Sequence, residues 1–496
     1  MGIILKQSIK GTIYSYLGIL IGFINVAVLF PILLSTKEVG LINILITYSI
    51  LFAQFSSLGL ANIITRLFPY FRDKQNNNNG FLFLILSIAF VGFIIGTSVF
   101  ILISPTLINE HKTQSPLFVE YIYYIIPLMF FLLFFNVLDA YNKVLYNATF
   151  GIFLKDIVLR LLNLAVILAY FFKLISFEKF VLFYILTNGI IVFLLILLLN
   201  IKKEFYLLPK FKFIDKKLRN SIISVGIFGI ITGLSGIVIA NIDKLMINID
   251  RNLGLSFTGV YSIAFFYGSI IIKPSLAVKK ISSVLIADAW KNNDTKKISE
   301  IYNKSSINLF IVGVYLFLGI WCNIHNVFKI LPEEYEAGKY VIFFIAFANL
   351  VEMFAGVSGT IMGNSKYYKT LSFFMIILVF LLIISNYILI PLYGITGAAL
   401  ASFLSYCVFV ALRYFFLLNK YKFQPIKIGH LYVLLLGVFV MIVLEYTIPK
   451  ANYFILDIAI RGAVITIIFG VGVVLLNVSD DINKKINNLK HKLLKK

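Results

Sequence analysis

The stretch GTIYSYLGILIGFINVAVLFP, residues 11–31, contains no charged side chain. An α-helix rises about 1.5 Å per residue, so an apolar segment of roughly 20 residues is long enough to cross the hydrocarbon core of a membrane. The segment is too long for the apolar part of a signal peptide and is not followed by a small-residue cleavage site. It therefore predicts a retained transmembrane helix over residues 12–34.

The composition extends this prediction to the whole chain. Of the 496 residues, 60% are hydrophobic and 13% are charged, and the mean hydropathy is +0.96. Soluble domains contain about 25% charged residues, so this composition is typical of an all-α polytopic membrane protein. We expect about 14 transmembrane helices, near residues 12–34, 41–64, 81–103, 117–138, 152–171, 179–200, 222–248, 256–278, 304–325, 340–363, 367–390, 394–416, 428–448 and 453–477.

The basic residues are unevenly divided between the two sets of alternating loops. Most of the 44 Lys and Arg residues lie in loops on the side of the N-terminus, whereas the opposite loops contain more acids than bases. Basic loops remain in the cytoplasm, so we expect a multi-pass protein with both termini cytoplasmic. The net charge of +22 then reflects topology and attraction to anionic membrane lipid, and it requires no nucleic-acid partner.

An internal repeat predicts how the helices are grouped. Span one leads into LSTKEVGLINI (34–44) and span seven into LSFTGVYSI (255–263), which aligns Gly40 with Gly259. Both halves begin on the same side and contain six spans, as in transporters built from parallel repeats. We predict an N-terminal lobe (1–205), a C-terminal lobe (206–420), and two further helices with a basic cytoplasmic tail (421–496).

Four segments resemble the signatures of a known family. They are LGLANIITRLFP (58–69), NIDKLMI (241–247), TGVYSIAFFYGSII (258–271) and PLYGITGAALAS (391–402), of which the last is the most specific. They are similar to the polysaccharide transporters, whose Wzx-type O-antigen flippases belong to the multidrug/oligosaccharidyl-lipid/polysaccharide (MOP, MATE-like) flippase superfamily. The resemblance covers essentially the whole chain.

This resemblance implies a fold, a function and a location. The fold has two six-helix lobes. The function is translocation of undecaprenyl-diphosphate-linked oligosaccharide repeat units of O-antigen, capsule or exopolysaccharide. The cargo would move from the inner to the outer leaflet of the bacterial cytoplasmic membrane by ion-coupled alternating access. Polysaccharide polymerase machinery is an expected partner.

Such a cargo has an anionic headgroup, so its transporter needs cationic side chains in a wet cavity. Lys273 precedes Pro274, which interrupts a helix where a cavity can satisfy the freed carbonyl, and we favour it as a headgroup contact over snorkelling to the interface. Arg461 lies inside the last span, where pairing with a neighbouring acid is the alternative. Three candidates near cytoplasmic helix ends have topology anchoring as their alternative role: Arg66, Arg160 and Arg413.

Three acidic residues are candidates for coupling or gating. Glu352 lies near the middle of its predicted span, where a carboxylate is costly unless it binds a proton, a cation or a basic side chain. Asp243 is followed directly by Lys244 near the outer end of span seven, and the alternative is that this pair marks the water boundary. Asp139 lies near the cytoplasmic end of span four, where a solvated pair with Lys143 is the alternative.

The sequence contains no nucleophile motif, phosphate-binding glycine motif or metal-ligand spacing, so it predicts no catalytic residue, metal or cofactor. A multidrug cation/proton antiporter of the same superfamily stays open as an alternative, although it would favour a more acidic cavity. A peptidoglycan-precursor flippase is disfavoured because residues 11–31 lack the pair of arginines characteristic of its first span. A membrane glycan polymerase or glycosyltransferase usually needs a large outer loop, which this chain lacks.

Overall fold

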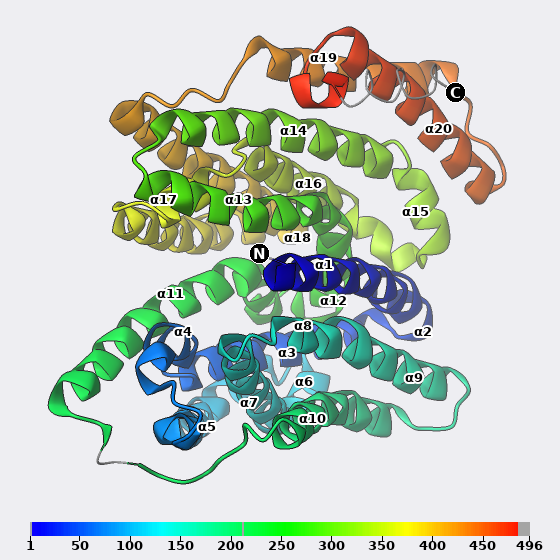
Figure 1. The fold of residues 1–496 in the computed structure, drawn as a ribbon. Coiled ribbons are helices and arrows are strands. Elements are labelled where there is room, and N and C mark those ends of the chain that lie inside the picture. The colour runs from blue at the N-terminus through cyan, green and yellow to red at the C-terminus, as the bar shows by residue number, and fades with distance from the viewer. Residues whose placement is uncertain (1, 211–212, 485–496) are drawn as a thin grey trace. The chain divides into compact units, whose positions relative to one another are not determined.

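The computed structural model describes residues 2–210 and 213–484, and all regular elements of this part are helical (Figure 1). The chain forms two compact units, Met1–Gly259 and Val260–Lys496. These bounds differ from the predicted lobes, which stay a prediction. The end of the predicted basic tail, residues 485–496, lies outside the described residues.

Twelve helical segments of the described chain are long and apolar enough to cross a membrane. One of them, α18 (Tyr368–Tyr421), changes direction at Gly394 and contains two predicted spans, 367–390 and 394–416. The predicted span 152–171 is helical as well, although a π-helical segment interrupts it. The predicted all-α fold with about 14 spans is therefore confirmed.

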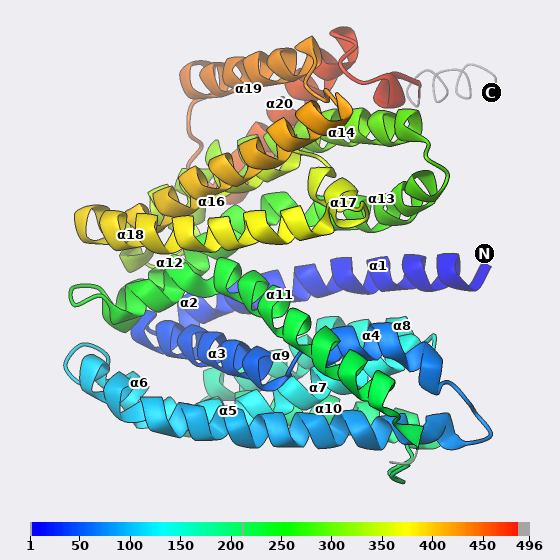
Figure 2. The ribbon, with the colours of Figure 1, turned by 90° about the vertical axis from the view of Figure 1, so that its left-hand side faces the viewer.

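The first unit begins with a helix, α1, that continues through a π-helical segment into α2. Its elements are α1 (Gly2–Gly22), η1 (Phe23–Leu29), α2 (Phe30–Leu33), α3 (Thr36–Ser56), α4 (Leu60–Phe71), η2 (Asn77–Gly80), α5 (Phe81–His111), α6 (Pro116–Tyr121), η3 (Ile122–Tyr124), α7 (Ile125–Val144), α8 (Ala148–Phe153), η4 (Leu154–Val158), α9 (Leu159–Phe171), α10 (Phe177–Ile201) and α11 (Lys216–Ile249). In Figure 2, the N-terminus of α1 and the turn between α5 and α6 lie at opposite ends of this unit.

Local sequence explains the boundaries of its second span. Ser35 and Glu38 form a capping box that starts α3, because each side chain accepts from the other residue's backbone amide. The helix is interrupted before α4 at Gly59, whose φ of +76° favours glycine. A Cβ at Gly59 would lie 2.2 Å from the carbonyl oxygen of Gly226 on α11, so only glycine allows this approach.

Gly40 and Gly259, the two glycines aligned by the repeat, lie where α3 and α12 (Gly254–Ser269) approach each other closely. A Cβ at Gly40 would lie 2.0 Å from the carbonyl oxygen of Leu255, and a Cβ at Gly259 would lie 2.0 Å from that of Thr36. The Thr36 and Ser256 hydroxyls hydrogen-bond at 2.7 Å beside them. Small residues at helix crossings let backbones approach closely, which explains the glycine at each of these repeat-related positions.

The second unit contains the remaining spans, together with the end of α12, which begins just before it. Its elements are α12 (Gly254–Ser269), η6 (Ile270–Ile272), α13 (Lys273–Lys291), α14 (Thr295–Trp321), α15 (Ile324–Ile330), η7 (Glu333–Gly338), α16 (Lys339–Phe354), α17 (Ser358–Gly363), α18, α19 (Ile428–Thr447) and α20 (Phe454–Leu475). The last two helices pack on α14 and share a buried apolar core with it that includes Val314, Val440 and Phe469.

Two spans of the second unit are discontinuous. The 3-10 turn η6 separates α12 from α13, and Pro274 occupies the first turn of α13, as its missing amide requires. The predicted span 340–363 is divided between α16 and α17 by a turn in which Gly356 has a φ of +57°. A Cβ there would lie 2.8 Å from the backbone nitrogen of Ser306, so the turn packs directly on α14.

Candidate functional site

Three charged side chains from three helices meet inside the second unit. Glu352 is on the last turn of α16, Arg413 is on the second half of α18, and Lys279 is on α13. Lys279 Nζ lies 2.8 Å from Glu352 Oε1, while Arg413 Nη2 donates to Glu352 Oε2. Arg413 Nη1 also lies 3.3 Å from Oε1. We call these three residues the Glu352 cluster.

The Glu352 cluster contains two cations and one anion. Its formal charge is therefore positive when all three groups are ionised. The Arg413 side chain is 3% exposed, that of Glu352 13% and that of Lys279 26%. A guanidinium that contacts a carboxylate through two nitrogens is held in a defined orientation, so Arg413 is the fixed cation of the cluster and Lys279 the more accessible one.

The protein supports Arg413 from two sides. Its guanidinium lies over the ring of Phe409, 4.3 Å from the centroid, in cation–π geometry. Gly359 on α17 approaches it so closely that a Cβ would lie 2.9 Å from Nη1. The buried Nε has no hydrogen-bond partner among the described residues. One hydrogen-bond donor of this buried cation is thus unsatisfied in the described part of the chain.

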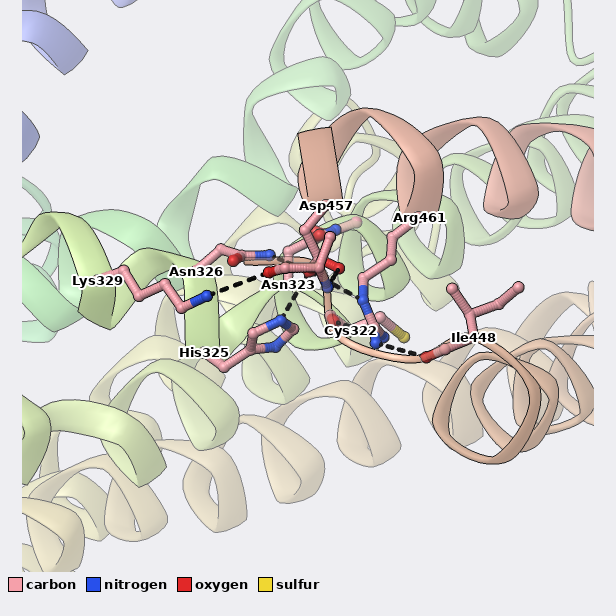
Figure 3. A network of polar contacts seen from close by, with 10 residues as sticks. Cys322, Asn323, His325, Asn326, Lys329, Ile448, Asp457 and Arg461 are labelled. Atoms are coloured by element: carbon pink, nitrogen blue, oxygen red, sulfur yellow. Dashed lines mark hydrogen bonds and ion pairs between the residues drawn. The ribbon is translucent and has the colours of Figure 1, made fainter. Parts of the chain in front are cut away.

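A second polar cluster connects α20 to α15 (Figure 3). Asp457 Oδ2 accepts from His325 Nε2 at 2.7 Å, Asn326 Nδ2 at 2.5 Å and Arg461 Nε at 3.0 Å. Its Oδ1 accepts from the backbone amide of Ala451 at 2.9 Å. We call Asp457 and these four donors the Asp457 cluster.

The Asp457–Arg461 ion pair at the centre of the Asp457 cluster is shielded from solvent. The Asp457 side chain is 1% exposed and that of Arg461 2%. Arg461 Nη2 donates to the Ile448 carbonyl at 2.9 Å. His325 lies on α15, outside the membrane-spanning helices, and burial lowers the pKa of its ring despite the hydrogen bond to Asp457. Both oxygens of Asp457 accept hydrogen bonds from the protein, and Arg461 donates to Asp457 and to backbone carbonyls, which is the arrangement of a structural joint.

The other predicted cations lie in different surroundings. Lys273 is half-buried at the first position of α13, whereas Arg66 is exposed on the amphipathic helix α4. Arg160 is on α9, where Nη1 donates to the Gly18 carbonyl and Nη2 lies 3.7 Å from Asp156 Oδ1. Of the five predicted cations, the structure places Arg413 alone in the Glu352 cluster.

The predicted acids are also separated. Asp139 on α7 forms an ion pair with Lys143 at 2.5 Å, but the Asp139 side chain is largely buried and its Oδ1 has no hydrogen-bond partner among the described residues. Asp243 is 5% exposed on α11, and Lys244 beside it is half-buried. The helix continues beyond them to Ile249. Glu352, as described above, directly contacts two basic side chains, Lys279 and Arg413.

Sequence reasoning missed several members of both clusters. Lys279 directly follows the predicted span 256–278 and was not considered for a site among the helices, whereas α13 continues as a helix to Lys291. Asp457 lies four residues before Arg461, a spacing that brings side chains together on a helix and was a usable signal. His325 and Asn326 had no such signal, because α15 meets α20 only in the tertiary structure.

Comparison with known proteins supports a transporter fold. No protein-family model and no curated protein matches the chain. The structure of the lipid II flippase MurJ, in an inward closed conformation, aligns with a TM-score of 0.71 and 14% identity over 94% of this chain and 98% of that one. An inward-facing multidrug resistance MATE family transporter aligns with a TM-score of 0.59 and 12% identity over 88% and 96%.

A MOP superfamily transporter from Pyrococcus furiosus, described as having a binding pocket of reversed polarity, aligns with a TM-score of 0.55 and 13% identity over 90% and 96% of the two chains. At these identities the likeness concerns the fold. The chain thus has the fold of MOP-superfamily transporters and flippases, and the O-antigen branch stays a prediction.

Proposed function

We propose that this protein is a flippase that moves an undecaprenyl-diphosphate-linked oligosaccharide from the inner to the outer leaflet of the bacterial cytoplasmic membrane. It would work by alternating access, as a transporter and not as an enzyme. The observation that supports this most strongly is the extent of the fold similarity. The lipid II flippase aligns with 94% of this chain, whereas the inward-facing MATE transporter aligns with 88% and has the lower TM-score.

The charge of the Glu352 cluster suits an anionic cargo. Two cations face one carboxylate, so the cluster retains positive charge that a diphosphate can neutralise. Arg413 has a planar array of donors that matches phosphate oxygens, and its Nε has no partner among the described residues. We propose that Lys279 and Arg413 contact the diphosphate, in addition to the sequence-based candidate Lys273.

Glu352 would act in this scheme as a positioning residue. It holds Arg413 and Lys279 in place while the site is without cargo, and an arriving diphosphate competes with it for both cations. Protonation of Glu352 would leave the buried Arg413 and the partly exposed Lys279 without their counter-charge. We therefore propose that its role is that of a gating counter-ion, and that any coupling ion binds elsewhere, with Asp243 as the next candidate.

The remaining predicted cations are less suited to contact the diphosphate. The donors of Arg461 are directed to Asp457 and to backbone carbonyls. Arg66 and Arg160 stay candidates near the predicted cytoplasmic ends of their helices, where they would attract the headgroup or anionic lipid before transport. Polysaccharide polymerase machinery would receive the cargo on the outer side.

A strain lacking the gene provides the test. Its lipids are extracted and analysed by mass spectrometry for undecaprenyl-diphosphate oligosaccharide, while the cells are stained for surface polysaccharide. We expect lipid-linked repeat units to accumulate and surface glycan to be lost, with both effects reversed by the wild-type gene. Unchanged lipids and glycan, together with new drug sensitivity, would contradict the proposal and favour a multidrug exporter.

A further inference from the structure

A polar hollow lies at one end of the first unit, away from the clusters described above. It has a volume of about 640 Å³ and is formed by the end of α5, the turn that follows it and the end of α11. Figure 2 shows this end of α5 opposite the N-terminus of α1. On the predicted topology the hollow opens on the outer side of the membrane.

The side chains that line the hollow are mostly hydrogen-bonding groups. The polar ones are Thr106, Asn109, Glu110, Thr113, Gln114 and Arg251. None of these side chains makes a hydrogen bond or ion pair with another described residue, so their donors and acceptors are available to a ligand. Hydroxyl and amide groups both donate and accept, as sugar hydroxyls require.

The charge and size of the hollow also favour a neutral polyol. Glu110 and Arg251 contribute one negative and one positive charge, so the lining has no net charge that would select a phosphate or a metal ion. Ile249 adds an apolar surface on which the C–H face of a sugar ring can pack. The volume lies within the range of about 300–1,000 Å³ typical of small-ligand sites.

The walls of the hollow are held in place by the fold. His111 packs on the ring of Phe118, with 4.9 Å between ring centroids, and the amide of Ser115 donates to the His111 carbonyl at 2.8 Å. A Cβ at Gly254, which has a φ of +60°, would lie 3.1 Å from the Gln114 carbonyl oxygen. The turns after α5 and α11 therefore pack against each other, which lowers the entropy cost of binding a ligand between them.

We propose that this hollow is a carbohydrate-binding site that holds part of an oligosaccharide on the outer side of the protein. The proposal rests on the proposed function for the identity of its ligand, since a flippase delivers the glycan to this side. Asn109 and Gln114 bind sugar hydroxyls through their amides, Glu110 accepts from a pair of hydroxyls, and Arg251 donates to ring or hydroxyl oxygens.

The test measures binding of a free sugar, separately from transport. The protein is purified in lipid nanodiscs and titrated by calorimetry with oligosaccharide released by mild acid from the surface polysaccharide of the native cells. We expect the N109A/Q114A variant to bind about tenfold more weakly, because two hydrogen bonds are lost. Thr106→Trp, which fills the hollow, should abolish binding. Glu120→Gln removes an exposed acid on α6 outside the hollow and should bind like wild type.

Each outcome bears on the site separately from the flippase proposal. Equal binding by wild type and both hollow variants, or no binding by wild type, would overturn the site even if the deletion strain accumulates lipid-linked glycan. Binding that depends on the hollow in a protein whose deletion leaves the lipids unchanged would support the site and contradict the flippase. Unfolding of a variant is detected by size-exclusion chromatography, and Arg251→Gln then replaces it.

Discussion

The Glu352 and Asp457 clusters contain the same kinds of groups, an arginine against a buried carboxylate, but they differ in what surrounds the pair. Asp457 accepts hydrogen bonds from four donors and its side chain is 1% exposed, and Arg461 also donates to backbone carbonyls. Glu352 is shared by two cations, and Arg413 keeps a donor without a partner among the described residues. A carboxylate that accepts four hydrogen bonds from the protein stabilises a joint, whereas a cluster with excess positive charge can exchange partners with an anionic ligand.

The largest effect on stability is expected from Asp457→Ala. The substitution leaves Arg461 buried without a counter-charge, which costs about 3–5 kcal/mol. The apparent Tm of purified protein in detergent should fall sharply. The double variant D457L/R461M removes both charges and should recover part of the loss. A Tm equal to wild type for Asp457→Ala would show that the Asp457 cluster is not a structural joint.

Arg413→Ala should instead have its main effect on transport. Loss of charge-assisted hydrogen bonds to a diphosphate is expected to reduce flipping at least about tenfold. The stability loss should be smaller than for Asp457→Ala, because Lys279 still neutralises Glu352. Arg413→Lys keeps the charge without the planar donors and should recover only part of the activity. Normal transport by Arg413→Ala would show that Arg413 does not bind the cargo.

These two clusters also show what sequence could and could not predict. Hydropathy predicted the helices, because the length and apolar composition of each span are visible in the sequence itself. Arg413 and Glu352 stood out as ionisable residues in apolar segments. Their contact did not, because it joins helices α16 and α18 through side chains 61 residues apart in the sequence. Lys279 was missed because it directly follows the apolar run of the predicted span 256–278, where a lysine is typical of a helix end.

A smaller effect is expected from Lys279→Ala. The Lys279 side chain is 26% exposed, and a partly solvated ion pair contributes about 0–1 kcal/mol. Transport should fall only severalfold, and the Tm should change little. Lys280→Ala, which removes the adjacent exposed lysine, is the matched control and should behave like wild type. A loss as large as that of Arg413→Ala would show that Lys279 and not Arg413 is the principal cation.

The smallest effect concerns pH and the Asp457 cluster. Burial lowers the pKa of His325 below its ordinary value of 6.5, so the unfolded chain binds the proton more readily than the folded protein. Stability should therefore decrease as the pH falls through about 6.5 toward the lower folded-state pKa. Comparing the Tm at pH 7.5 and 5.5 tests this, with His325→Gln as control. An undiminished pH dependence in His325→Gln would assign the effect to another group.

The most direct test of flippase activity uses purified protein in proteoliposomes that contain undecaprenyl-diphosphate oligosaccharide in both leaflets. A membrane-impermeant glycosidase added outside cleaves the glycan that reaches the outer leaflet. Wild-type protein should make nearly all of the lipid-linked glycan accessible, while Arg413→Ala and protein-free vesicles leave about half protected. Equal protection with wild-type protein, with Arg413→Ala and without protein would contradict the proposed flippase activity.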